Sequence, residues 1–288
     1  MKTILLPVDY TDGNMMTVKY AIRIAGATET RLHLFHIYPD QLLIPDSSFP
    51  TGIDSDAIIS SEFIIELRNQ AEENMLAFHE QVDKFIEENH IQNIEVSHLV
   101  TGGDPEWEIR EVIQSLKPYL IVMGTRGEGK KGFLEGSMAE KIMVSADIPV
   151  LAVPHSIEDI QLHNIMYATN FNENDFERIT SMINIFDAID PRVHIVHFEL
   201  KKRFAEDRQL MDTLQVALQN EFPGKKLSFH LLDSTSKGEA IKRFTEDKGV
   251  ELIAFIAHKS NLFTNLFSSG IHKKDFFKLE LPMLAMEV

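Results

Sequence analysis

A glycine-rich stretch in the first half of the chain has the residues needed to bind phosphate. Residues 122–143 read VMGTRGEGKKGFLEGSMAEKIM, with five glycines and two adjacent lysines. Glycine lets the backbone approach an anion closely because it has no Cβ. Ser137-Met138-Ala139-Glu140 has the capping-box pattern, so a helix is expected to begin there, with free amides that attract anions. The stretch therefore indicates a phosphate site between the end of a strand and the start of a helix.

Three phosphate-binding patterns compete for this stretch. Residues 127–132, GEGKKG, fit the dinucleotide fingerprint by letter, but that fingerprint follows the first strand of its unit and this stretch follows a later one. Residues 124–130 fit most of a Walker A loop, but Lys131 stands where Ser or Thr would hold magnesium. The third pattern, Gly-x-x-Gly and then Gly-Ser over 124–137, can grip a polyphosphate from two sides. The alternative without a ligand is a surface turn followed by a helix cap.

The segments around the loop predict an α/β fold. Near-continuous apolar strands alternate with helical patterns, which is typical of a parallel sheet covered on both faces. A segment rich in Pro, Ser, Asp and Gly at 42–56 is expected to be a loop. The predicted strands are 3–9, 31–37, 94–100, 119–124 and 150–153, and the predicted helices are about 15–27, 62–89, 105–116 and 137–145.

The second half of the chain repeats the first. RLHLFHI at 31–37 matches RVHIVHF at 192–198, an offset of 161, whereas IPVLAV at 148–153 matches LPMLAM at 281–286, an offset of 133. The first half therefore holds 161 − 133 = 28 more residues, mostly around 39–65.

The repeat predicts two domains. Their expected limits are 1–155 and 163–288, joined by a linker at 154–163.

Composition narrows the function classes. The 288-residue chain is 44% hydrophobic and 25% charged, which is typical of a soluble globular protein. Its formal net charge of −16 repels nucleic acid, so nucleic acid is not expected as a partner. No stretch reaches the length of a membrane span. The chain has no cysteine, which excludes disulfides and thiolate metal sites and suits a cytoplasmic location.

Three segments together resemble the universal stress protein family: ILLPVDY at 4–10, VMGTRG and GS within 122–137, and IPVLAVP at 148–154. The resemblance covers the chain as a tandem pair of family domains. It implies a doubly wound, five-stranded, Rossmann-like parallel sheet in each half, of the adenine nucleotide alpha hydrolase type. It also implies ATP, with or without Mg²⁺, as the ligand of a regulatory nucleotide-binding module in the stress response.

Members of the family that bind ATP carry Gly-x-x-Gly, nine residues, and then Gly-Ser or Gly-Thr. The spacer here has eight residues, EGKKGFLE at 128–135. A loop that contains glycine can absorb one deletion, or the deletion can tighten the site. The ligand contacts that the resemblance implies are Pro7, Val8, Asp9 and Ile37 at the adenosine, Met123, Gly124, Arg126 and Gly127 along the nucleotide, and Gly136, Ser137 and Met138 at the phosphates.

The second half lacks the glycine loop. Ile256 and Lys259 stand at the positions of Gly124 and Gly127. A side chain at those positions occupies the space where a phosphate needs bare backbone. The second half is therefore not expected to bind ATP in the manner of the first.

The resemblance also suggests how the two halves associate. Family dimers often pair through the last strand of each domain, so residues 150–153 and 283–286 are expected to meet in an internal pseudo-dimer. A homodimer of the whole chain remains a further option.

Two other functions stay open. One is a nucleotide-free protein–protein interaction module that uses the second domain and the insertion at 39–65. The other is an ATP-using enzyme, but no pairing of a nucleophile with a base is visible, so at most slow ATP hydrolysis is expected. His33 and His36 are three apart on a strand and point to opposite faces, which argues against a shared metal. Trp107 is expected to pack in the interior.

Overall fold

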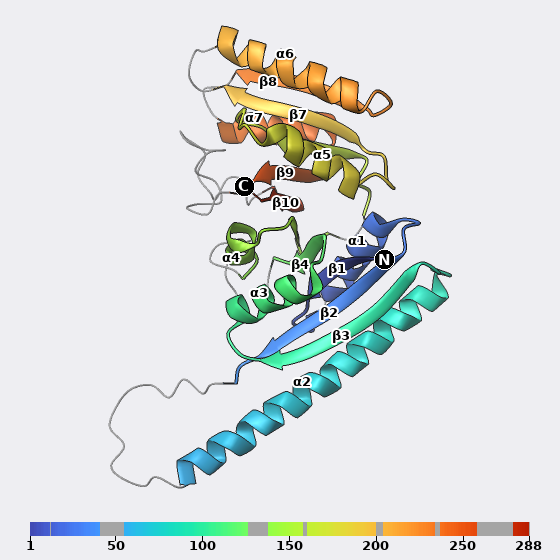
Figure 1. Ribbon diagram of the computed structural model, residues 1–288, viewed down its shortest axis with the longest axis vertical. Coiled ribbons are helices and arrows are strands. Elements are labelled where there is room, and N and C mark those ends of the chain that lie inside the picture. Colours follow the sequence, from blue (N-terminus) through green and yellow to red (C-terminus); the bar gives the residue numbers. More distant parts are fainter. Residues whose placement is uncertain are drawn as a thin grey trace.

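The computed structural model describes residues 1–11, 13–40, 55–125, 138–157, 160–199, 204–233, 237–257 and 279–287. In the first half, buried apolar strands alternate with helices, as the sequence predicted (Figure 1). The elements are β1 (Lys2–Pro7), α1 (Asn14–Ala25), β2 (Thr30–Tyr38), α2 (Ser55–Glu88), β3 (Ile94–Gly102), α3 (Pro105–Leu116), β4 (Leu120–Gly124), α4 (Met138–Ser145) and β5 (Val150–Val153).

The second half repeats this order. Its described elements are β6 (Asn164–Ala168), α5 (Asp175–Ile185), β7 (Arg192–Glu199), α6 (Phe204–Glu221), β8 (Leu227–Asp233), α7 (Lys237–Lys248), β9 (Leu252–Ile256) and β10 (Met283–Met286). None of the helices in the described part of the chain combines the length and the apolar character needed to cross a bilayer.

The ten strands in the described part of the chain form one sheet. Their order is β3-β2-β1-β4-β5-β10-β9-β6-β7-β8, so each half contributes five strands in the doubly wound order. Strands within each half are parallel, and the halves meet where β5 pairs with β10 in antiparallel register, with Leu151 opposite Leu284. The expected pairing of 150–153 with 283–286 is therefore present.

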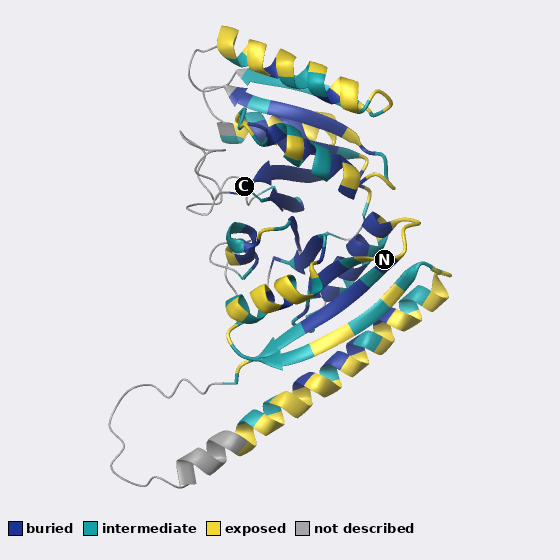
Figure 2. Cartoon of the chain, viewed as in Figure 1, coloured by how far each residue is buried: buried dark blue, intermediate teal, exposed yellow. Residues whose placement is uncertain are grey.

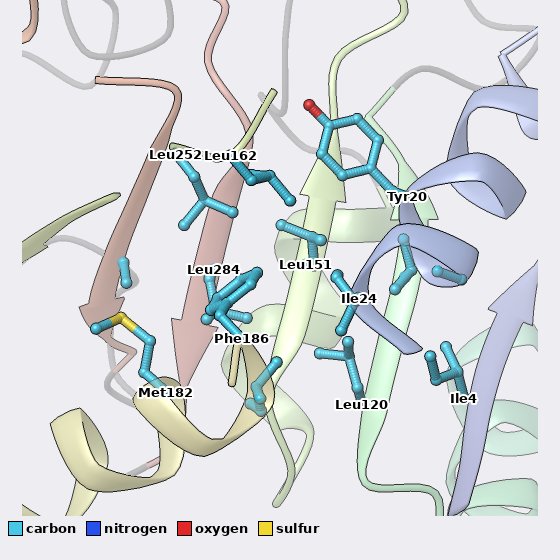
Figure 3. Packing of buried hydrophobic residues seen from close by; sticks show 14 of the residues in the cluster. Ile4, Tyr20, Ile24, Leu120, Leu151, Leu162, Met182, Phe186, Leu252 and Leu284 are labelled. Atoms are coloured by element: carbon cyan, nitrogen blue, oxygen red, sulfur yellow. The ribbon is translucent and has the colours of Figure 1, made fainter. Parts of the chain in front are cut away.

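Each face of the sheet carries one continuous core. Side chains of α1, α2, α5 and α6 cover one face, and side chains of α3, α4 and α7 cover the other. Figure 3 shows Leu151 and Leu284 beside Phe186, so the core on the first face crosses the boundary between the halves. The apolar strands are buried on both faces, as expected of central parallel strands.

Helix α2 begins earlier than the sequence predicted. The expected start was about residue 62, after a loop at 42–56, but the helix already begins at Ser55. The Ser and Asp residues at 55–56, which favour turns, also favour the start of a helix, so the composition of the segment was misleading. The turn from β3 into α3 does follow the sequence, because Asp104 caps α3 by accepting from Trp107 N at 3.0 Å and Pro105 occupies its first turn.

Candidate ligand-binding pocket

A pocket of about 250 Å³ opens at the carboxyl ends of β1, β2 and β4. The chain runs from β1 outward to β2 and β3 and then returns to the other side of β1 as β4, so the pocket lies where the strand order reverses. Ligands of open α/β sheets bind at such a point. Helices α3 and α4 contribute Pro105, Ile109, Met138 and Ala139 to its wall.

The structure brings together every predicted site residue that it describes. Four separate segments supply them: the end of β1, the end of β2, the end of β4 and the start of α4. The seven residues are Pro7, Val8, Asp9, Ile37, Met123, Gly124 and Met138. The other four predicted residues, Arg126, Gly127, Gly136 and Ser137, lie outside the described residues.

The loop after β1 is held in a fixed shape. Val8 N donates to Phe35 O at 2.8 Å, and Asp9 N donates to the Asn14 side chain at 2.9 Å. Thr11 donates to Asp9 Oδ1 twice, from its backbone N at 3.2 Å and from Oγ1 at 2.7 Å. Asp9 thus keeps a defined orientation in the wall of the pocket.

His36 completes this wall. Its Nδ1 lies 2.8 Å from Val8 O, and because a carbonyl can only accept, Nδ1 carries the proton and donates. Burial lowers the pKa of His36, although the bond to Val8 and the nearby Asp9 act in the opposite direction. The neutral ring therefore has Nε2 as an acceptor.

The end of β4 adds a buried hydroxyl. Thr125 is 2% exposed, and its backbone N donates to Val153 O at 3.1 Å. Its Oγ1 is buried without a hydrogen-bond partner among the described residues. Lys141 of α4 pairs with Glu106 of α3, and this pairing raises the pKa of Lys141.

The comparisons with known proteins decide the family. The family model described as "Universal stress protein family" matches residues 1–154, more than half of the chain. The chain belongs to the universal stress protein family. A universal stress protein of Methanocaldococcus jannaschii is 31% identical over 153 residues, which are 53% of this chain and 81% of that protein.

Solved structures show that the tandem fold occurs elsewhere. A universal stress protein from Archaeoglobus fulgidus superposes with a TM-score of 0.67 at 17% identity, covering 99% of this chain and 96% of that one. A protein of unknown function from Pseudomonas aeruginosa gives a TM-score of 0.58 at 14% identity, with 100% and 92% covered. At these identities the likeness concerns the fold.

The second half carries larger side chains at three positions that line the pocket in the first half. Phe255 and Ile256 stand where the first half has Met123 and Gly124, and both are buried, at 0% and 6% exposure. Phe198 replaces Ile37 in the same way. The expectation that the second half lacks the ligand site of the first stays a prediction.

Sequence reasoning missed half of the described wall. The missed residues are Asn14, Phe35, His36, Pro105, Ile109, Thr125 and Ala139. Phe35 and His36 adjoin the predicted Ile37, and Thr125 lies inside the quoted glycine stretch, so the carboxyl ends of adjacent parallel strands were the signal that could have found them. Nothing in the local sequence marks Pro105 and Ile109, because they reach the pocket only through the packing of α3.

Proposed function

We propose that the first domain binds ATP in this pocket and that the chain acts in the cytoplasm as a regulatory nucleotide-binding module. One observation carries the proposal: seven residues expected at the nucleotide come from four distant segments and line a single pocket. Membership of the universal stress protein family supports it further. The role is binding, with at most slow hydrolysis of the bound ATP.

The shape and chemistry of the pocket suit a nucleoside. A volume of about 250 Å³ lies below the usual range of about 300–1,000 Å³ for a complete ligand. The pocket therefore suits the adenosine part, with apolar contacts from Phe35, Ile37 and Ile109 and an acceptor at Asp9. The phosphates would then extend past the mouth toward the start of α4, where free backbone amides favour anions, and Mg²⁺ would accompany them there.

We further propose domain limits of 1–155 and 163–288, with the second domain in the place of a second subunit. The antiparallel pairing of β5 with β10 supports this internal pseudo-dimer.

A nucleotide-free interaction module is the second candidate function. It is favoured by Phe63 and Ile65 on α2, which are 43% and 57% exposed.

Calorimetric titration with ATP and Mg²⁺ tests the proposed site. The Gly124→Ile variant introduces the side chain that the second half carries at this position and should abolish binding. Gly224→Ala is the matched control, because no atom lies within 4 Å of a Cβ at Gly224. We expect one ATP per chain for the wild type and the control. Absence of heat at millimolar ATP, or full binding by a folded Gly124→Ile variant, would contradict the proposal.

A further inference from the structure

Tyr10 connects the wall of the ligand pocket to the long helix α2. It directly follows Asp9, and its ring lies 4.3 Å from the ring of His36, measured between centroids. Its hydroxyl donates to Ala71 O of α2 at 2.9 Å. Because Asp9 and His36 both line the pocket, this one side chain touches the pocket wall with its ring and α2 with its hydroxyl.

Ala71 marks the point where α2 leaves the sheet. It is the first buried side chain in the part of the helix whose side chains are described, and residues 62–70 before it are exposed or half-buried (Figure 2). A 34-residue helix is about 50 Å long, whereas the nine-residue strands β2 and β3 beneath it span about 30 Å. The hydroxyl of Tyr10 therefore bonds the helix at the start of its projecting part.

The second half provides an internal comparison. Phe171 takes the place of Tyr10 with nearly the same backbone, φ 56° against 61°, and its ring lies 4.4 Å from that of His197. His197 Nδ1 also lies 2.9 Å from Thr169 O, which matches the 2.8 Å between His36 Nδ1 and Val8 O. The turn, the ring contact and the histidine bond are thus kept without the hydroxyl. The turn therefore forms without the hydroxyl, which is present only in the first half, where the pocket lies.

We propose that Tyr10 is a positioning residue for the ligand and that it couples ligand binding to α2. A ligand that contacts Asp9 and His36 restricts the loop that carries Tyr10. The restricted hydroxyl then holds Ala71 O more persistently, so α2 opens less often around that point. By linkage, anything that stabilises α2 there also strengthens ligand binding. This inference rests on the proposed function, because it needs a ligand in the pocket.

Hydrogen exchange of the full chain, with and without ATP and Mg²⁺, tests the coupling. In the wild type we expect amides near Ala71 to exchange about fivefold more slowly with ATP, the effect of one hydrogen bond of ordinary strength. Tyr10→Phe should remove this protection and weaken ATP binding by about the same factor. Tyr119→Phe is the control, because it also removes one tyrosine hydroxyl but lies near the amino end of β4, opposite the strand end that carries the pocket. The centroid of the Tyr119 ring lies 5.2 Å from Lys2 Nζ.

The outcomes separate this inference from the proposed function. Absence of ATP binding by the wild type refutes both. ATP binding without slower exchange in α2 overturns the coupling alone. Protection of α2 that is equal in the wild type and in Tyr10→Phe overturns the role of Tyr10. If Tyr10 had only a structural role, Tyr10→Phe would lower the stability of the protein, but ATP would still slow hydrogen exchange in α2.

Discussion

Replacing Gly26 by alanine should strongly destabilise the contact between the two halves. Gly26 follows α1 with φ 55° and ψ −125°, and a Cβ at this position would lie 2.3 Å from Cβ of Ala188 in the second half. Two costs are therefore expected to add. This backbone lies outside the left-handed helical region, so it costs a residue with a Cβ about 1–3 kcal/mol, and relieving the overlap costs about 1–3 kcal/mol, as in overpacked cores.

Gly249→Ala measures the cost of positive φ without an overlap. Gly249 has φ 58°, and no atom lies within 4 Å of a Cβ built there. We expect the free energy of unfolding to fall by about 1–2 kcal/mol for Gly249→Ala and by about 2–6 kcal/mol for Gly26→Ala. Adding Ala188→Gly to Gly26→Ala removes the overlapping atom and should restore about 1–3 kcal/mol.

Urea unfolding followed by circular dichroism measures these differences. The wild type, the two single variants at Gly26 and Ala188, and the double variant form a double-mutant cycle, whose coupling energy reports the contact between the halves. The reasoning fails if Gly26→Ala is no more destabilising than Gly249→Ala. It also fails if Ala188→Gly recovers no stability in the Gly26→Ala background, because the halves would then not touch at this point.

Two further predictions concern buried polar groups. Burial lowers the pKa of His194 from 6.5 to about 4. Between these pH values only the unfolded chain takes up the proton, so urea unfolding should show stability falling as pH falls, by at most about 1.4 kcal/mol per pH unit, with a flatter profile in His194→Leu. The buried carboxylate of Asp175 accepts from two hydroxyls and one backbone amide, so Asp175→Ala should lower the free energy of unfolding by about 3 kcal/mol or more in the same assay.

The strands and the general place of the site could be read from the sequence because both depend on local patterns. Buried parallel strands are continuous apolar runs, and β1, β4 and β5 are such runs. Parallel strands also align their carboxyl ends, so residues that follow β1 and β4 come close together without any knowledge of packing. The family resemblance implied that Asp9 and Gly124 belong to one site, and this alignment brings them together although 115 positions separate them (124 − 9).

The errors arose where a side chain depends on its helix face or on distant packing. Trp107 was expected in the interior but is exposed. The core face of α3 is set by Ile109 and Val112, and at 100° per residue Trp107 lies about 200° from Ile109, on the opposite side. Its aromatic character suggested burial, but the helical period places its side chain on the solvent-exposed face of α3. The early start of α2 was missed for a comparable reason, because residues that favour turns also favour helix starts.

The two halves share contacts that belong to the fold and differ at the positions of the pocket. Both keep the same buried histidine–serine pair across neighbouring strands, His33 with Ser97 at 2.9 Å and His194 with Ser228 at 2.7 Å. These contacts belong to the fold and therefore survive in both copies.

The pocket residues diverge instead, and the direction of the change has an energetic reason. The first half leaves a pocket open and buries the Thr125 hydroxyl without a partner among the described residues, and both features cost stability. The second half has Ala257 at the position of Thr125, and Phe255 and Ile256 at the positions of Met123 and Gly124. Substitutions of this kind stabilise a protein where no ligand site has to be kept. The proposed ligand of the first half would offset the cost of its open pocket and its buried hydroxyl.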